Sequence, residues 1–318
     1  MARILVTGGA GFIGSNLTKK LLDENHTVFC VDNLNNSYPA KFKKQNIEPF
    51  ALNKNWEFFK GDITNPKFIK DVFGKTKPEK IIHLAARTGV RQSIANPQLY
   101  FRTNLIGTIN LLEAVKKFGM PQFIFGSSSS VYGNLTRIPF AESETNLAPI
   151  SPYGISKLAA ERVVFLYSRL YKIPAIILRF FTVYGPKGRP DMAPYIFAEA
   201  IFKGLKINKF GKGQTLRDYT YVDDIVEGIL AVTNKILTFD IINLGNSHPV
   251  SLNHLIKITE RVVGKSAKIK NLPKQVGDVE KTYASIEKAK KILHWQPTTT
   301  FEEGMTKFFK WYIESKRG

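Results

Sequence analysis

A tyrosine and a lysine stand four residues apart, at a spacing that suits proton-transfer chemistry. Tyr153 and Lys157 open a stretch with helical periodicity, so their side chains share one helix face, one turn apart. A nearby ammonium stabilises a phenolate and lowers the pKa of the tyrosine from about 10 towards the working pH, as a general base requires. The pair is also common on plain helix surfaces, so its meaning depends on its surroundings.

Four consecutive serines, residues 127–130, precede this pair. They directly follow an apolar run at Gln122–Phe125 that is typical of a buried strand. Hydroxyls at the carboxyl end of a strand lie where doubly wound sheets bind ligands, although a serine run can also form a solvated turn. The four serines are therefore candidate ligand-binding hydroxyls.

A glycine string indicates a dinucleotide site. Gly8, Gly11 and Gly14 follow an apolar strand and open a helix, where glycines permit a tight turn and close approach of a pyrophosphate to the helix N-terminus. Asp32 ends the next strand, and a carboxylate there accepts both ribose hydroxyls and repels a 2′-phosphate, which favours NAD over NADP. The candidate cofactor-binding residues are Gly8, Gly11, Phe12, Ile13, Gly14, Asp32, Asn33, Asp62, Ile63, Leu84, Ala85, Ala86, Asn104, Tyr153 and Lys157.

Strands and helices alternate through the first half of the chain. We expect strands at Arg3–Thr7, Thr27–Val31, Trp56–Lys60, Lys80–Leu84, Gln122–Phe125 and Ala175–Arg179, and helices at Phe12–Leu22, Asn104–Lys117 and Ser156–Tyr171. This pattern predicts a Rossmann-type α/β fold with a doubly wound parallel sheet. Beyond about Phe180 the loops lengthen, so we expect an NAD-binding domain at 1–180, to which 219–246 returns, and a smaller mixed α/β C-terminal substrate lobe at 181–318.

Composition limits the alternatives. The chain has 318 residues, is 43% hydrophobic, and contains a single cysteine, Cys30, which rules out an internal disulfide. No apolar run approaches the ~20 residues that span a bilayer, and the first residues lack a signal-peptide layout, so we expect a cytoplasmic protein. Histidines and carboxylates show no metal-ligand spacing, and we expect no metal.

The formal net charge of +20 is the most unusual bulk property. It permits binding of nucleic acid or an anionic membrane, attraction of small polyanions, or simply a lysine-rich surface. The lysines are spread along the chain, without a basic run that alternates with aromatic residues. We therefore expect neither nucleic acid nor membrane as a partner.

Taken together, these segments resemble the extended short-chain dehydrogenase/reductase family over essentially the whole chain. The resemblance rests on the glycine string, on Ser127–Gly133 and on Tyr153 with Lys157. It implies that Tyr153 removes a proton from a sugar hydroxyl while NAD takes the hydride, and that Lys157 also holds the nicotinamide ribose. It further implies that Ser128 and Ser130 orient a nucleotide sugar, and that a homodimer forms through the helices at 104–117 and 156–171.

The acids of two related reactions are missing. The 4,6-dehydratases of this family carry an Asp-Glu pair where Ser129 and Ser130 stand, and UDP-glucuronate decarboxylases carry a glutamate at Ser130. Epimerisation, which needs only oxidation, turning of the 4-keto sugar and reduction, remains.

Two segments resemble those of UDP-glucuronate 4-epimerases. One is 87–93 leading into Asn96-Pro97, although Gln92 replaces the usual tyrosine, and the other is 179–193. Thr182 and Arg189, helped by Ser129, are assigned to the sugar carboxylate, because a guanidinium binds both carboxylate oxygens in a planar fork. The candidate substrate-binding residues are Arg91, Ser128, Ser129, Ser130, Thr182, Arg189, Tyr195 in the uracil wall, Arg217 at phosphate and Asp278 near the ribose.

Three hypotheses follow. The first is NAD-dependent 4-epimerisation of UDP-glucuronate to UDP-galacturonate. The second is the same chemistry on UDP-glucose and UDP-galactose. The third, suggested by the charge, is a non-catalytic dinucleotide-binding regulator, which the presence of both Tyr153 and Lys157 disfavours.

Overall fold

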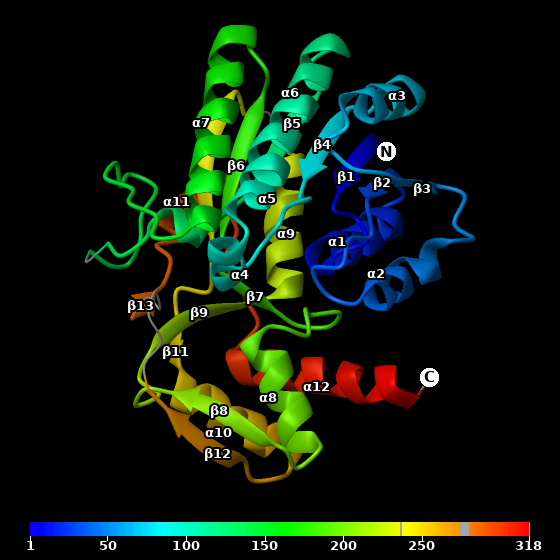
Figure 1. The fold of residues 1–318 in the computed structure, drawn as a ribbon. Helices are drawn as coiled ribbons and strands as arrows, with labels where there is room; N and C mark the ends of the chain where they lie inside the picture. The colour runs from blue at the N-terminus through cyan, green and yellow to red at the C-terminus, as the bar shows by residue number, and fades with distance from the viewer. Residues whose placement is uncertain (136, 236, 274–279, 318) are drawn as a thin grey trace.

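Seven parallel strands form the central sheet of the computed structural model, which describes residues 1–135, 137–235, 237–273 and 280–317 (Figure 1). Their order is β10-β6-β5-β4-β1-β2-β3, which confirms the predicted Rossmann-type sheet. The strands are β1 (Arg3–Thr7), β2 (Thr27–Asp32), β3 (Trp56–Lys60), β4 (Lys80–His83), β5 (Gln122–Ser128), β6 (Ala175–Phe180) and β10 (Phe239–Leu244).

Helices cover both faces of this sheet. One face carries α3 (Pro66–Thr76), α6 (Gly107–Lys117) and α7 (Pro152–Tyr171), and the other carries α1 (Phe12–Asp23), α9 (Val222–Thr233), α2 (Ala40–Ile47) and α11 (Glu287–Leu293). Alternate strand residues supply the two cores: Leu5 packs with the first helix group, whereas Ile4 and Val6 pack with the second. Strands buried on both faces explain the near-continuous apolar runs in the sequence.

The strand order reverses between β1 and β4, which places the ligand crevice. β1 pairs with β2 on one side and with β4 on the other, and both pairings are parallel. The loops that leave the carboxyl ends of β1 and β4 therefore diverge to opposite faces of the sheet. Open sheets of this type bind ligands at such a point.

A smaller group of elements lies beyond the carboxyl edge of the sheet, in the lower half of Figure 1. Two small sheets form there, one from β7 (Thr182–Tyr184), β9 (Leu216–Tyr221), β11 (Pro249–Ser251) and β13 (Lys281–Thr282), and one from β8 (Lys206–Phe210) and β12 (Lys268–Leu272). They pack with α8 (Ala193–Phe202), α10 (Leu252–Val263) and α12 (Phe301–Arg317). Within the segment 219–246, α9 and β10 join the large sheet, while β9 belongs to the small one.

Two helices begin earlier than predicted. The helix expected from Asn104 starts at Pro97, after α4 (Val90–Ala95), and runs through α5 (Pro97–Phe101) and a π-helical turn (Arg102–Ile106) into α6. The helix expected from Ser156 starts at Pro152, where the Ser151 hydroxyl accepts a hydrogen bond from the Gly154 amide at 3.1 Å. In both cases a proline occupies the first helical turn after a capping side chain.

Candidate active site

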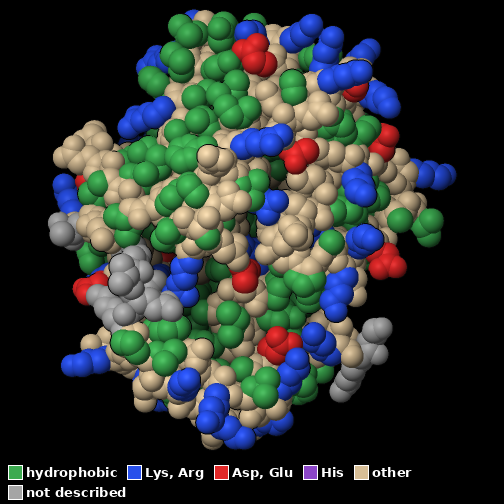
Figure 2. Space-filling model, viewed as in Figure 1, with side chains coloured by type: hydrophobic (Ala, Val, Ile, Leu, Met, Phe, Trp, Pro, Cys, Tyr) green, Lys and Arg blue, Asp and Glu red, His purple; other side chains and the backbone are tan. Residues whose placement is uncertain are grey.

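A cleft of about 750 Å³ opens between the large sheet and the smaller group of elements. Its walls come from the loops after β1, β2, β4 and β5, from the start of α7, and from β7 and the segment that follows it. Figure 2 shows the surface hollowed between the upper and lower parts of the molecule. Most of the predicted cofactor residues and most of the predicted sugar residues thus line one cavity.

The turn after β1 is built for close approach of a ligand. Gly8 has a φ of +74°, and a Cβ there would lie 2.7 Å from the Ala85 amide nitrogen. A Cβ on Gly14 would lie 2.2 Å from the Gly8 carbonyl oxygen. The following helix α1 starts without a side-chain cap or an acidic residue in its first turn, so its free amides face the cleft and suit a diphosphate.

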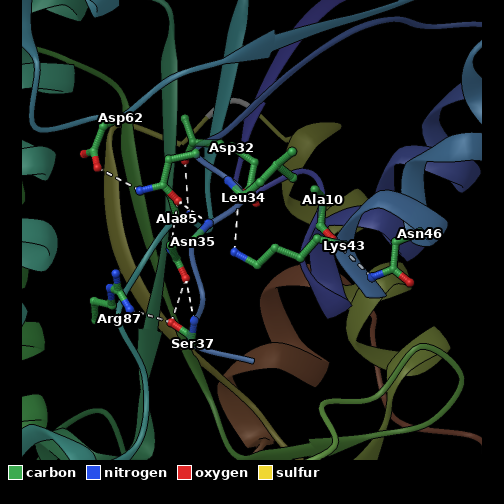
Figure 3. A network of polar contacts seen from close by, with 12 residues as sticks. Ala10, Asp32, Leu34, Asn35, Ser37, Lys43, Asn46, Asp62, Ala85 and Arg87 are labelled. Carbon is green, nitrogen blue, oxygen red and sulfur yellow. Dashed lines mark hydrogen bonds and ion pairs between the residues drawn. The ribbon is translucent and has the colours of Figure 1, made fainter. Parts of the chain in front are cut away.

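Asp32, at the end of β2, is buried and lines the cleft. Its Oδ1 accepts hydrogen bonds from the Leu34 amide at 2.8 Å and from the Lys43 ammonium at 3.2 Å (Figure 3). The sequence analysis missed Lys43, because nothing local to α2 shows that it reaches β2. A buried carboxylate at this strand end suits the two hydroxyls of a ribose.

A ladder of polar side chains fixes the loop after β2 across the cleft. The Asn33 amide donates to Asp62 at 2.7 Å, Asn35 donates to Asn33 at 2.8 Å, and the Ser37 hydroxyl donates to Asn35 at 2.7 Å. Arg87, after β4, donates to the Ser37 hydroxyl at 2.9 Å (Figure 3). Asp62, a predicted cofactor-binding residue, thus lines the cleft with a carboxylate that already accepts hydrogen bonds from Asn33 and Thr64.

Tyr153 and Lys157 sit in the first two turns of α7 and both line the cleft. Burial raises the pKa of Tyr153, and a hydrogen bond with Ser128 and the charge of Arg189 oppose that rise. Lys157 donates to the Gly126 carbonyl oxygen at 2.6 Å, and burial lowers the pKa of its ammonium to about 7. Ser128 and Arg189 therefore favour the phenolate in this geometry, and the role of Lys157 towards Tyr153 stays a prediction.

A buried ion pair between Glu161 and Arg179 lies one helical turn from Lys157. Glu161, one turn beyond Lys157, accepts two hydrogen bonds from the Arg179 guanidinium of β6, at 3.0 and 2.8 Å. The Ser127 hydroxyl donates to the same carboxylate at 2.6 Å. The Glu161 charge opposes the effect of burial on Lys157 by raising its pKa. The sequence analysis missed this pair, which joins α7 to the two strands that carry the site.

The other predicted hydroxyls lie on the cleft wall beside Tyr153. Ser129 and Ser130 form a short 3₁₀ turn (Ser129–Val131), in which the Ser130 amide donates to the Ser128 hydroxyl oxygen at 3.1 Å. Thr182 opens β7, two residues after the end of β6, and is half-buried. All four hydroxyl-bearing residues face the same cavity, which suits a polyhydroxylated ligand.

Arg189 lines the cleft and is held by two partners from different parts of the chain. Its Nε and Nη2 donate to the two carboxylate oxygens of Asp191, at 3.0 and 2.5 Å. Its Nη1 donates to the hydroxyl of Thr88, in the loop after β4. The predicted guanidinium therefore lines the cleft with an internal carboxylate on one edge.

Two predicted residues lie away from the cleft lining, and a third cannot be placed because it is outside the described residues. Tyr195 is buried in an aromatic cluster with Phe308 and Tyr312, away from the cleft lining, because α8 turns that face towards α12. Asn104 is also absent from the lining: its side chain bonds the backbone of Arg87 at 2.7 and 2.9 Å. Asp278 lies outside the described residues. Arg91 and Arg217 do line the cleft.

No metal centre accompanies these groups in the part of the chain that the structure describes. No cluster of three histidine, cysteine or carboxylate side chains there is placed to hold an ion. His83, in β4, bonds Thr7 at 2.7 Å and Thr108 at 3.0 Å, and burial lowers its pKa. It is a satisfied core histidine. Among the described helices, none is long and apolar enough to cross a membrane.

Comparison with known proteins gives matches along almost the whole chain. A family model described as GDP-mannose 4,6 dehydratase matches residues 5–308. A UDP-glucuronate 4-epimerase of Thermodesulfobacterium geofontis is 42% identical over 316 residues, which cover 99% of this chain and 97% of that protein.

Solved structures agree with these matches. A UDP-glucuronic acid 4-epimerase from Bacillus cereus, in complex with UDP-glucuronic acid and NAD, is 35% identical, covers 98% of this chain and 99% of its own, and has a TM-score of 0.93. A UDP-glucose 4-epimerase from Thermotoga maritima, with UDP-glucose, is 34% identical with the same coverage and a TM-score of 0.91.

Proposed function

The chain belongs to the GDP-mannose 4,6-dehydratase family of extended short-chain dehydrogenases/reductases, and we propose that within it the protein is an NAD-dependent UDP-glucuronate 4-epimerase. The observation that carries the proposal is the position of Arg189, whose guanidinium shares the cleft with Tyr153 and Ser128. The Asp-Glu pair of the dehydratases is replaced by Ser129 and Ser130, so this chain lacks the acid that eliminating water requires.

The chain's own residues suit NAD. The Gly8–Gly14 turn leaves room for a diphosphate at the N-terminus of α1, and the buried Asp32 carboxylate stands where the adenosine ribose would lie. NAD, when bound, supplies the redox chemistry at sugar C4. Lys157, at the floor of the same cleft, is placed to hold the nicotinamide ribose.

Proton transfer falls to Tyr153. It takes the proton of the sugar C4 hydroxyl, and after the 4-keto sugar has turned it returns that proton to the C4 oxygen. Ser128 hydrogen-bonds Tyr153 and lies beside the same hydroxyl, so it holds both partners in line. The charge of Arg189 favours the phenolate as well.

Arg189 and Thr182 hold the sugar carboxylate, with help from Ser129. The 4-keto uronate is a β-keto acid that can lose carbon dioxide. Holding its carboxylate out of line with the carbonyl π system suppresses that loss. Arg217 and Arg91, which line the same cleft, would contact a phosphate of UDP and the sugar, respectively. In this division of labour, residues 1–180 with α9 and β10 bind NAD, and the rest of 181–318 binds the UDP-sugar.

The similarity to a UDP-glucose 4-epimerase supports a second candidate, UDP-glucose and UDP-galactose as substrates. The two candidates differ at sugar C5, where a carboxylate replaces a hydroxymethyl group. The discriminating experiment incubates the purified protein with each UDP-sugar and resolves the products, with Tyr153→Phe as the inactive control.

Arg189→Ala then identifies the substrate. Losing a charged hydrogen-bond pair costs about 1.5–3 kcal/mol, so kcat/KM should fall by roughly 10- to 150-fold more for UDP-glucuronate than for UDP-glucose, which loses only the effect of the Arg189 charge on Tyr153. No UDP-galacturonate from the wild-type protein would refute the uronate assignment. Equal losses on both sugars would remove Arg189 from the carboxylate site.

We also propose that the protein forms a homodimer through α6 and α7. Ile155, Leu166 and Leu170, on one side of α7, are 45%, 49% and 62% exposed. Their spacing of eleven and four residues places them in one stripe on the helix. A stripe of large exposed apolar side chains is costly in water, and a second copy of α7 would cover it.

A further inference from the structure

Asp191 occupies one edge of the guanidinium that the proposed function assigns to the substrate carboxylate. The two residues belong to one turn, Arg189–Met192, which the Met192 amide closes by donating to the Arg189 carbonyl oxygen at 3.2 Å. Pro190 follows Arg189 in this turn, at the position that favours a proline. The backbone thus places a carboxylate beside Arg189 before any substrate arrives.

Asp191 and Thr88 use only some of the N–H donors of Arg189, so two donors remain for a ligand. A guanidinium has five N–H donors. Asp191 takes the Nε donor and one on Nη2, and Thr88 takes one on Nη1. Counting the partners that the structure describes, one donor remains on Nη1 and one on Nη2, which is the number that a second carboxylate needs for bidentate binding.

Thr88 makes the arrangement rigid from the other side of the cleft. Its carbonyl oxygen accepts a hydrogen bond from the Tyr100 hydroxyl at 2.8 Å, so its own position is fixed by α5. Arg189 is therefore held between the loop after β4 and the turn before α8. Its side chain is only 16% exposed, so it has little freedom to swing.

We infer that Asp191 is a positioning residue for the uronate reaction: it orients the Arg189 guanidinium so that its remaining Nη1 and Nη2 donors face the substrate carboxylate. This inference rests on the proposed function. Asp191 also offsets the charge of Arg189, so recognition of the uronate depends on the direction of these donors more than on net charge. Misdirected donors would leave the carboxylate free to align with the C4 carbonyl.

A misaligned 4-keto uronate has a defined fate. The C5–C6 bond breaks and carbon dioxide leaves. The electron pair of that bond passes into the C4–C5 enolate, which then takes a proton from water at C5. The product is a UDP-linked 4-keto pentose. Formation of this UDP-4-keto-pentose, or of the UDP-pentose that results when the hydride taken from C4 is returned to it, therefore reports how well the carboxylate is held. A change in overall stability alone would not produce either compound.

The test compares Asp191→Asn, Asp191→Glu and wild type on UDP-glucuronate and UDP-glucose. An asparagine side chain keeps the size of Asp191, but it replaces one of the two acceptor oxygens that Arg189 uses with an NH₂ donor. For Asp191→Asn we expect kcat for UDP-glucuronate to fall about 10-fold or more and the UDP-pentose fraction to increase. We expect KM not to rise, because the substitution removes a negative charge from the site of an anionic substrate. Asp191→Glu should restore part of both losses.

Asp23→Asn is the matched control, because it removes the same charge from an exposed pair with Lys19 in α1. It should leave turnover and products unchanged. A uronate kcat that stays at the wild-type value in Asp191→Asn, without extra UDP-pentose, would overturn the inference, as would equal losses on the two sugars. A wild-type protein that does not convert UDP-glucuronate would instead refute the proposed function itself. Binding of UDP-glucuronate to each variant, measured by calorimetry, shows that the variant is folded and keeps its ligand.

Discussion

At the scale of single residues, the site places a cation where it is poorly solvated. Lys157 is buried, lies over the Phe125 ring at 4.5 Å and has one carbonyl partner, Gly126. The Glu161 carboxylate compensates only in part, so the pKa of the lysine falls from 10.5 to about 7. A group held at such a cost to stability is typical of a functional site.

Replacing Lys157 by methionine should therefore abolish turnover while stabilising the fold. Below pH ~7 the lysine is charged in both the folded and unfolded states, so folding bears the full burial cost. As the pH rises towards ~10.5 both states become neutral and the cost disappears. We expect Lys157→Met to raise the free energy of unfolding by about 1–2 kcal/mol near pH 6, since losing the bond to Gly126 offsets part of the gain, and to lose this advantage near pH 10.

Urea unfolding across this pH range measures the effect. A stabilisation that grew with pH, or a destabilised variant at low pH, would contradict the assigned direction of the Lys157 pKa.

At the scale of elements, the first strand–turn–helix unit depends on backbone that only glycine permits. A Cβ at Gly14 would collide with the Gly8 carbonyl oxygen at 2.2 Å, and α1 would have to move away from β1. Because the free amides of α1 form the proposed diphosphate site, we expect displacement of α1 to affect cofactor binding first and the rest of the sheet less.

Gly14→Ala should thus lose most of its NAD affinity and some stability. We expect the melting temperature to fall and the NAD content of the purified protein, measured after release of nucleotide, to drop sharply. Gly74→Ala is the matched control: Gly74 lies in α3 with its nearest Cβ neighbour, a Phe118 ring carbon, 4.0 Å away. It should stabilise the protein by roughly 0.5–1 kcal/mol, as alanine does in an exposed helix. Normal NAD content in Gly14→Ala would show that α1 does not bind the diphosphate.

At the scale of the whole molecule, contacts between distant parts of the chain join the large sheet to the smaller group of elements beside the cleft. Arg189 reaches Thr88 across it, and Asn16 of α1 donates to the Pro186 carbonyl oxygen at 3.1 Å. The smaller group of elements is therefore attached to the sheet on both sides of the cavity. The apolar stripe of α7 belongs to the part of the molecule that contains the large sheet. A dimer that forms through this stripe would therefore leave the cleft open to solvent.

The double substitution Leu166→Glu/Leu170→Glu should make the protein monomeric. Two buried carboxylates in an apolar interface each cost several kcal/mol, which exceeds what most dimers of this size can tolerate. Light scattering after size-exclusion chromatography gives the mass. Leu205→Glu, a comparably exposed leucine at the end of α8, should leave the mass unchanged. A wild-type protein that is itself monomeric would refute the proposed interface.

Local sequence patterns by themselves determined the elements of the sheet and the order of the catalytic motifs. The ranges predicted for the strands β1 and β3 match the structure, and the turn at Gly8–Gly14 and the Tyr153/Lys157 face of α7 followed from spacing alone. Such features depend on residues that lie within a few positions of one another, and these can be read directly from the sequence.

Only the tertiary structure decided which polar side chains pair. Lys43 with Asp32, Glu161 with Arg179, and Thr88 with Arg189 join residues from different elements. The tertiary structure also buries Tyr195 in an aromatic cluster away from the cleft lining, and it pairs the Asn104 side chain with the backbone of Arg87. The reason is physical: a hydrogen bond or an ion pair depends on distances of about 3 Å, and these are set by the strand order and helix packing of the whole molecule.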